Sequence, residues 1–180
     1  ACIKGNLTAL YKYAYMLENG IGIPMNPSKA LNYYASAISK NEINSLDRFA
    51  YMFEKGIGCA VDIDVAIKYY KIGIANGNSD AMMHYAQMLE NGNGIKMNIY
   101  EAIHYYKMAI EKGNAKAMFH YANLLENRIG TENSIIEAIK NYKKAIDKGN
   151  IDAMFNYALI FLNTEEVDDE MYKSIEEIIN

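Results

Sequence analysis

A 36-residue sequence pattern recurs along this chain and places the strongest constraint on its fold. Copies of the pattern begin near residues 9, 45, 81, 117 and 153. One position is alanine in every copy, and a second is alanine in four copies. The two sets are Ala14, Ala50, Ala86, Ala122 and Ala158, and Ala30, Ala66, Ala102 and Ala138. A repeat of this length predicts an array of stacked helical units, each of which buries its apolar face only against its neighbours.

The copy that begins at residue 81 predicts two helices joined by a turn. Apolar residues recur with a 3.6-residue period over residues 81–89 and again over residues 102–110. Asn78 and Asn98 precede these two segments and are good N-cap residues. The cap position of the second helix holds Asn26, Asp62 and Ser134 in the other copies.

The turn between the two helices contains a Gly-x-Gly pair, Gly92 and Gly94, which raises the question of a phosphate-binding loop. Such a loop needs a glycine turn that follows a strand and leads into a helix N-terminus. Here the pair follows a helix and recurs in other copies. We therefore interpret it as a helix end with a tight turn, and we expect no nucleotide and no other cofactor.

Composition excludes several classes of function. Eighteen Lys and Arg residues stand against 22 Asp and Glu, with no basic run, so we expect no nucleic-acid partner. No apolar run approaches the length of about 20 residues that a membrane span needs, so we expect no membrane insertion. Cys2 and Cys59 lack metal-ligand spacing and cannot form a disulfide framework. We expect no metal site, no catalytic residue and a cytoplasmic location.

The order of motifs resembles the Sel1-like repeat, a relative of the tetratricopeptide repeat. It reads Ala-x-x-x-Tyr-Ala-x-x-Leu, then Gly-x-Gly-Ile, then a helix with Ala and Tyr-Tyr-Lys, then Lys-Gly-Asn. The chain has Tyr85-Ala86 where the family has Leu-Gly, and Tyr105-Tyr106 where it has Trp-Tyr. The resemblance implies an all-α fold, a right-handed superhelix of about five helix-turn-helix repeats. By analogy with the family, the endoplasmic reticulum lumen is an alternative location.

The repeats occupy residues 1–180 as a single array. Residues 1–6 align with the end of a second helix, so we expect the chain to be a piece of a longer protein.

By similarity to tetratricopeptide arrays, the first helix of each repeat lines a concave groove with the face that points away from the packing seam. Two rows of residues on this face change character between copies, unlike the seam positions. The predicted partner-binding residues are Tyr11, Tyr15, Arg48, Tyr51, Met83, Gln87, Phe119, Asn123 and Phe155. Aromatic residues, Met and Arg are enriched at protein interfaces. The alternative, that these side chains only pack within the stack, stays open.

These observations predict a non-catalytic protein–protein interaction scaffold that binds a partner peptide or protein along the groove. One alternative is a structural component of a large multi-protein assembly with end-to-end contacts. Another is the regulatory repeat region of a longer enzyme such as a kinase.

Glutamates recur just before the turn, and we expect them to have a structural task such as bonding loop amides. They are Glu18, Glu54, Glu90 and Glu126.

Overall fold

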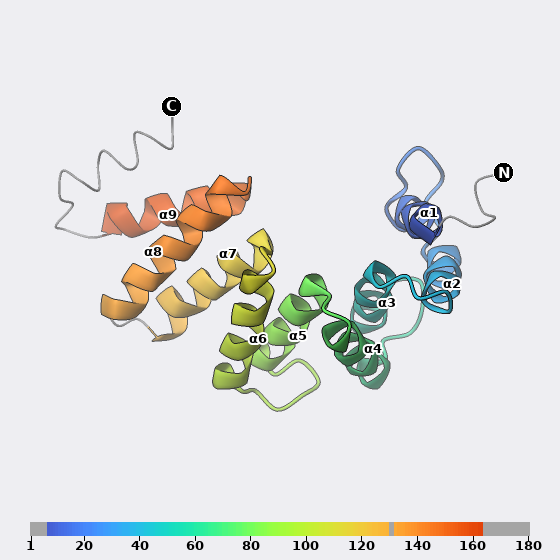
Figure 1. The fold of residues 1–180 in the computed structure, drawn as a ribbon, viewed down its shortest axis with the longest axis horizontal. Coiled ribbons are helices and arrows are strands. Elements are labelled where there is room, and N and C mark those ends of the chain that lie inside the picture. The colour runs from blue at the N-terminus through green and yellow to red at the C-terminus, as the bar shows by residue number, and fades with distance from the viewer. Residues whose placement is uncertain (1–6, 130–131, 164–180) are drawn as a thin grey trace. The chain divides into compact units, whose positions relative to one another are not determined.

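The computed structural model describes residues 7–129 and 132–163, and within these ranges it is helical and contains no strand (Figure 1). The predicted all-α class is confirmed. The elements are α1 (Leu7–Asn19), α2 (Pro27–Ile38), α3 (Asn44–Lys55), α4 (Ile63–Ala75), α5 (Ser79–Asn91), α6 (Ile99–Glu111), α7 (Ala115–Leu124), the π-helical turn η1 (Leu125–Ile129), α8 (Glu132–Asp147) and α9 (Ile151–Asn163).

The chain divides into two compact units, unit 1 (Ala1–Lys112) and unit 2 (Gly113–Asn180). In unit 1, α1 packs on α2, α3 on α4 and α5 on α6, and successive pairs are joined by contacts of α2 with α3 and of α4 with α5. In unit 2, α7 packs on α8, and α8 packs on α9. Each pair is one helix-turn-helix repeat, so the described residues hold four complete repeats and the helix α9 that begins the next.

The alanine positions form the tightest part of the core. Ala14, Ala50, Ala86 and Ala122 have no exposed surface, and neither do Ala30, Ala66, Ala102 and Ala138. Small side chains at both positions let the paired helices approach closely. Large side chains fill the space around them, among them the fully buried Tyr34, Tyr70, Tyr106 and Tyr142. The recurring alanines are therefore packing positions of the repeat.

Side-chain caps begin most of the second helices as predicted. The side chains of Asn26, Asp62 and Asn98 each accept a hydrogen bond from the backbone N–H three residues on. The predicted cap at Ser134 is wrong, because α8 already begins at Glu132. In this repeat α7 continues directly into η1.

The two glycines of the second and third turns have different tasks. Gly56 and Gly92 adopt left-handed backbone conformations and end α3 and α5. The second glycine touches the preceding repeat. A Cβ atom on Gly58 would lie 2.5 Å from the carbonyl carbon of Pro27, and one on Gly94 would lie 2.3 Å from Cγ2 of Ile63. The Gly-x-Gly pair is thus a helix end combined with a stacking contact between repeats.

Comparing Gly58→Ala with Gly22→Ala should separate the stacking contact from backbone strain. Both glycines have positive φ, 77° and 70°, but a Cβ on Gly22 would meet only Met16 Cε, at 3.9 Å. We expect Gly22→Ala to cost about 1 kcal/mol and Gly58→Ala about 3 kcal/mol of unfolding free energy. Urea unfolding followed by circular dichroism measures both costs. Equal costs would show that the second glycine does not serve stacking.

Candidate functional site

A tyrosine–glutamate hydrogen bond joins the two helices of every described repeat. The second-helix tyrosine donates its O–H to the glutamate near the end of the first helix. The pairs are Tyr34–Glu18 at 2.8 Å, Tyr70–Glu54 at 2.7 Å, Tyr106–Glu90 at 2.7 Å and Tyr142–Glu126 at 2.8 Å. Burial raises the pKa of all four tyrosines above 10.0, and the bonded glutamate adds to each rise. The structural task predicted for the glutamates is confirmed, but their partner is a tyrosine rather than a loop amide.

In the first repeat the pair gains an arginine from the next repeat. Arg48 on α3 donates from Nε to Oε2 of Glu18 on α1, 3.3 Å away, and Nη2 pairs with Oε1 of the same carboxylate. Burial works against the charge of Arg48, but the hydrogen bonds and charge of Glu18 outweigh it and raise the guanidinium pKa. Glu18 therefore holds Arg48 in one orientation, and α1 and α3 are tied together.

Two tyrosine rings flank this arginine. The guanidinium carbon of Arg48 lies 5.7 Å from the ring centroid of Tyr15 and 5.1 Å from that of Tyr51. Both distances are within the range of cation–π attraction. Lys55 Nζ lies 5.7 Å from the same Tyr51 ring. Tyr15, Glu18, Arg48 and Tyr51 are called the Arg48 cluster below.

A histidine–aspartate contact continues the face toward α5. His84 Nδ1 lies 2.6 Å from Oδ1 of the buried Asp47, which links α5 to α3. The His84 ring also lies 5.1 Å from Tyr51 and 5.8 Å from Tyr70, measured between ring centroids. The first helices α1, α3 and α5 are thus connected by polar and aromatic side chains on one face of unit 1.

The structure brings together four of the predicted groove residues in unit 1. Tyr15, Arg48 and Tyr51 meet in the Arg48 cluster, and Tyr11 stacks on Tyr15 with ring centroids 6.4 Å apart. Gln87 on α5 is half-buried. A role of these residues in binding stays a prediction.

The prediction that Met83 faces an open groove is wrong, because only 2% of its surface is exposed. The same repeat position explains why. Tyr11 lies 5.9 Å from the ring of Tyr34, and Phe119 lies 6.1 Å from that of Tyr142. In both cases the side chain leans onto the second helix of its own repeat. This row therefore belongs largely to packing within the repeat.

The remaining predicted residues lie in unit 2. Phe119 is half-buried against Tyr142, and the backbone carbonyl of Asn123 accepts a hydrogen bond from Asn127 at 3.0 Å. Phe155 on α9 is 67% exposed. The structure therefore shows no cluster in unit 2 that unites these three residues in the way that Tyr15, Arg48 and Tyr51 meet in unit 1.

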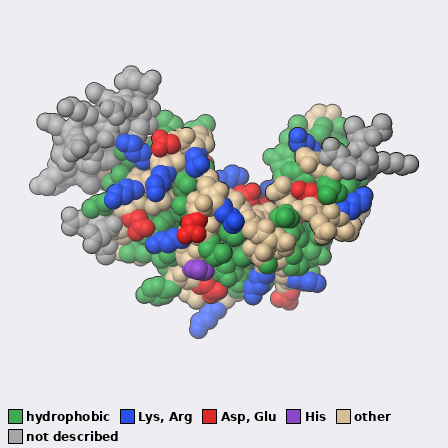
Figure 2. All heavy atoms as spheres, in the orientation of Figure 1, with side chains coloured by type: hydrophobic (Ala, Val, Ile, Leu, Met, Phe, Trp, Pro, Cys, Tyr) green, Lys and Arg blue, Asp and Glu red, His purple; other side chains and the backbone are tan. Residues whose placement is uncertain are grey.

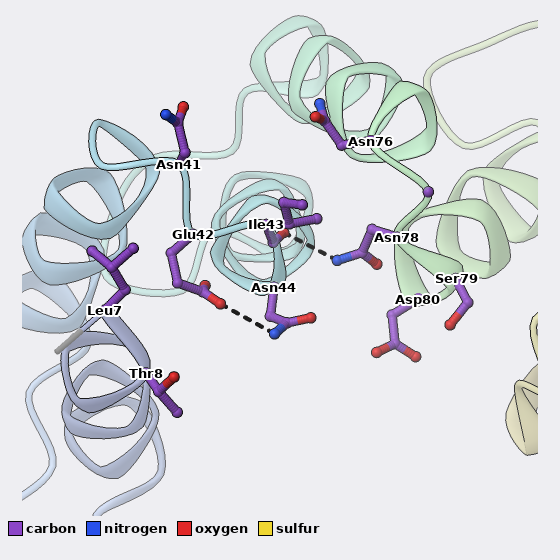
Figure 3. A pocket seen from close by; sticks show the side chains of 11 residues that line it. Leu7, Thr8, Asn41, Glu42, Ile43, Asn44, Asn76, Asn78, Ser79 and Asp80 are labelled. Atoms are coloured by element: carbon purple, nitrogen blue, oxygen red, sulfur yellow. Dashed lines mark hydrogen bonds between the residues drawn. The ribbon is translucent and has the colours of Figure 1, made fainter.

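A cavity of about 510 Å³ opens at the N-terminal ends of α1, α3 and α5 (Figure 3). Most of its lining is polar: Thr8, Asn41, Glu42, Asn44, Asn76, Asn78, Ser79 and Asp80. The sequence does not predict this cavity, although it does predict an N-cap at Asn78, which is part of the lining.

Several of these polar groups have structural partners. Glu42 Oε2 accepts from the backbone N–H and Oγ of Ser45, both at 2.7 Å. Asn78 accepts from the backbone N–H of Ala81 at 2.8 Å and donates to the carbonyl of Ile43 at 3.1 Å. These bonds cap helices and join two repeats. The cavity therefore has a structural explanation, and we place the candidate site at the Arg48 cluster instead.

The face changes its charge character between the cavity and the Arg48 cluster. Burial raises the pKa of Tyr11 and Arg48 opposes this, while Asp47, Asp80 and Glu42 add to the rise. The surroundings of Tyr11 toward the cavity are thus acidic. The positively charged side chains of this face, Arg48 and Lys55, lie farther from the cavity along α3.

The described residues offer neither a metal site nor a membrane span. Among residues 7–129 and 132–163, no three His, Cys, Asp or Glu side chains are grouped in a way that suits a metal ion. The helices in the same ranges are too short or too polar to cross a membrane. Lys and Arg side chains lie among Asp and Glu on the face shown in Figure 2.

Comparison with known proteins gives one sequence family and several similar folds. The sequence model of the Sel1 repeat matches residues 7–42, 47–78, 79–114 and 115–150. No curated protein matches the sequence. A protective antigen of uropathogenic Escherichia coli that displays an SLR fold is similar in structure, with a TM-score of 0.79 and 23% identity. The match covers 97% of this chain and 37% of the antigen, so this chain spans little more than a third of that protein.

Two further solved structures share the fold. A Sel1 repeat protein from Oxalobacter formigenes has a TM-score of 0.77 and 23% identity, over 97% of this chain and 74% of that one. The immunity protein Pa5087 from Pseudomonas aeruginosa has a TM-score of 0.52 and 14% identity, over 97% of this chain and 81% of that one. At these identities the likeness establishes the helical repeat fold alone.

The buried tyrosines should make stability fall at alkaline pH. The pKa of such a tyrosine is higher in the folded state than its value of 10.0 in the unfolded state. The stability that this group contributes is therefore fully present below pH 10 and is lost as the pH rises above that value. Removing one such group by Tyr106→Phe should reduce the slope of unfolding free energy against pH by about 1.4 kcal/mol per pH unit above pH 10. Urea unfolding at a series of pH values measures both slopes. An unchanged slope would contradict the assignment of Tyr106 as a buried, neutral donor.

Proposed function

The chain belongs to the Sel1 repeat family, and on this premise we propose that it is a non-catalytic scaffold that binds a partner protein or peptide. Proteins of this family are generally protein-interaction scaffolds. We place the partner on the face that α1, α3 and α5 form in unit 1. We also propose that the partner meets the chain in the cytoplasm, because Cys2 and Cys59 do not form a disulfide framework of the kind that oxidising compartments favour.

The Arg48 cluster is the observation that carries this proposal. Tyrosine and arginine are the residue types that dominate binding energy at protein interfaces, above all where they are held in place before binding. Glu18 fixes the guanidinium of Arg48, and the guanidinium lies against Tyr15 and Tyr51. Tyr15 is exposed and Tyr51 is half-buried. The cluster therefore offers an ordered, amphipathic contact area to a partner.

A structural component of a larger assembly is the second candidate, because α9 in unit 2 exposes a row of apolar side chains. Ile151, Phe155 and Leu162 follow one another at spacings of four and seven residues, and all three are exposed. These spacings place them on one side of the helix. An exposed apolar row of this kind is typical of a surface that contacts another protein.

Removing the tyrosine rings tests the scaffold proposal. We expect the double variant Tyr15→Ala and Tyr51→Ala to lose its partner by about tenfold or more, because two aromatic anchors disappear. The measurement is quantitative mass spectrometry of proteins crosslinked to the chain in native material. Tyr100→Ala, at an exposed tyrosine of α6, is the matched control and should retain the partner. Equal recovery by the double variant and the control would refute this face as the interface.

The assembly candidate makes a different prediction. The isolated chain should associate as its concentration rises, and Phe155→Ser should weaken this association by about tenfold because it removes a ring from the exposed row. Static light scattering over a concentration series measures the mass of both proteins. A wild-type chain that stays monomeric throughout the series would remove α9 as a self-association surface.

A further inference from the structure

The ion pairs of α3 are oriented with their cations outward. In the Arg48–Glu18 pair the arginine side chain is 22% exposed and the glutamate side chain 3%. In the Lys55–Glu54 pair, 2.5 Å between Nζ and Oε1, the lysine side chain is 43% exposed and the glutamate side chain 7%. Each pair is close to neutral as a whole. A molecule that approaches from solvent nevertheless meets the cations first.

The Arg48 cluster also has hydrogen-bond donors that are not used within the described chain. Arg48 uses Nε and Nη2 for Glu18, and its Nη1 makes no hydrogen bond to a described residue. The same holds for the hydroxyls of Tyr15 and Tyr51. No buried side-chain nitrogen or oxygen among the described residues lacks a partner, so these three groups must reach solvent. The cluster therefore presents a guanidinium edge and two hydroxyls outward.

We propose that the Arg48 cluster recognises a carboxylate side chain, Asp or Glu, on the partner protein, with Arg48 Nη1 as the principal donor and Lys55 beside it. This inference rests on the proposed function, because it names the chemistry of the partner at the same face. Charge complementarity supports it, since Glu18 and Glu54 are buried and occupied by Arg48 and Lys55.

A cationic partner fits this position poorly. Arg48 and Lys55 already lie over the faces of the rings that would attract a positive charge. An incoming lysine or arginine would have to displace one of them and would meet the other. An incoming carboxylate needs no displacement, because it accepts hydrogen bonds from groups that already point to solvent.

Glu18 acts in this scheme as a positioning residue. Its two carboxylate oxygens receive two donors of the guanidinium, and its Oε2 also accepts a hydrogen bond from the hydroxyl of Tyr34. The planar guanidinium is thereby fixed with its remaining edge outward. The partner carboxylate would then bind an arginine that has already lost its rotamer freedom, which lowers the entropic cost of binding.

Selection of random displayed peptides on the full chain provides probes for the test. Each enriched peptide is synthesised in its own form and with every Asp replaced by Asn and every Glu by Gln. Affinities are measured by fluorescence anisotropy for the wild-type chain, for Arg48→Gln and for Arg128→Gln. Arg128 is the other arginine of the sequence and lies exposed in unit 2, so it provides a matched loss of a guanidinium.

We expect the enriched peptides to share an acidic residue. Its amide form should bind the wild-type chain and Arg128→Gln about tenfold more weakly, and Arg48→Gln should bind both forms about equally. The comparison of peptide forms on the wild-type chain needs no variant, so it holds even where Arg48→Gln fails to fold. Lys55→Gln adds a variant that leaves the pairing of Glu18 intact, and it should reduce the difference between the two peptide forms.

Distinct outcomes separate this inference from the proposed function. Peptides that bind through Tyr15 and Tyr51 but contain no acidic residue, or that bind equally in the amide form, would overturn the carboxylate inference and leave the scaffold intact. The inference would also be overturned if the amide form lost as much affinity for Arg48→Gln as it does for the wild-type chain. Displacement by inorganic phosphate and not by glutarate would reassign the position to a phosphoryl group. If no enriched peptide responds to Tyr15→Ala and Tyr51→Ala, the proposed function fails, and this inference fails with it.

Discussion

The tyrosine–glutamate hydrogen bond is the interaction on which the rest of this structure depends. A buried hydroxyl without a partner is costly, so the fully buried tyrosine of each second helix requires an acceptor inside the repeat. The glutamate near the end of the first helix supplies it, and this contact fixes the position of one helix on the other. The second helix in turn packs on the next first helix, as α2 does on α3 and α4 on α5. The same bond therefore sets where successive first helices lie, and with them the face that they share.

Features that depend on the repeat period and on residue size could be predicted from the sequence. Contacts between two helices could not. The alanine positions and Gly-x-Gly turns recur because packing recurs, so period and residue size were sufficient. Met83 was predicted to be solvent-facing, since a helical period tells which face a residue occupies but not whether the paired helix reaches over it. The tyrosine partner of each glutamate lies 16 residues away. That contact depends on how the two helices of a repeat pack on each other. The hydrophobic period within one helix gives no information about this packing.

One position of the first helix carries a different residue in different repeats, and the surface therefore differs from repeat to repeat. It contacts the tyrosine–glutamate pair of the preceding repeat, and it is Arg48, His84 or Asn156 in different copies. His84 stacks near Tyr70, and Asn156 donates to the hydroxyl of Tyr142 at 3.4 Å, so each is used within the protein. Arginine differs because its five donors exceed what one carboxylate can accept in this geometry. A lysine would place a single compact charge against Glu18, but the planar guanidinium binds Glu18 along one edge and presents the other to solvent. The requirement to satisfy a buried glutamate and the capacity to bind a partner are thus met by the same side chain.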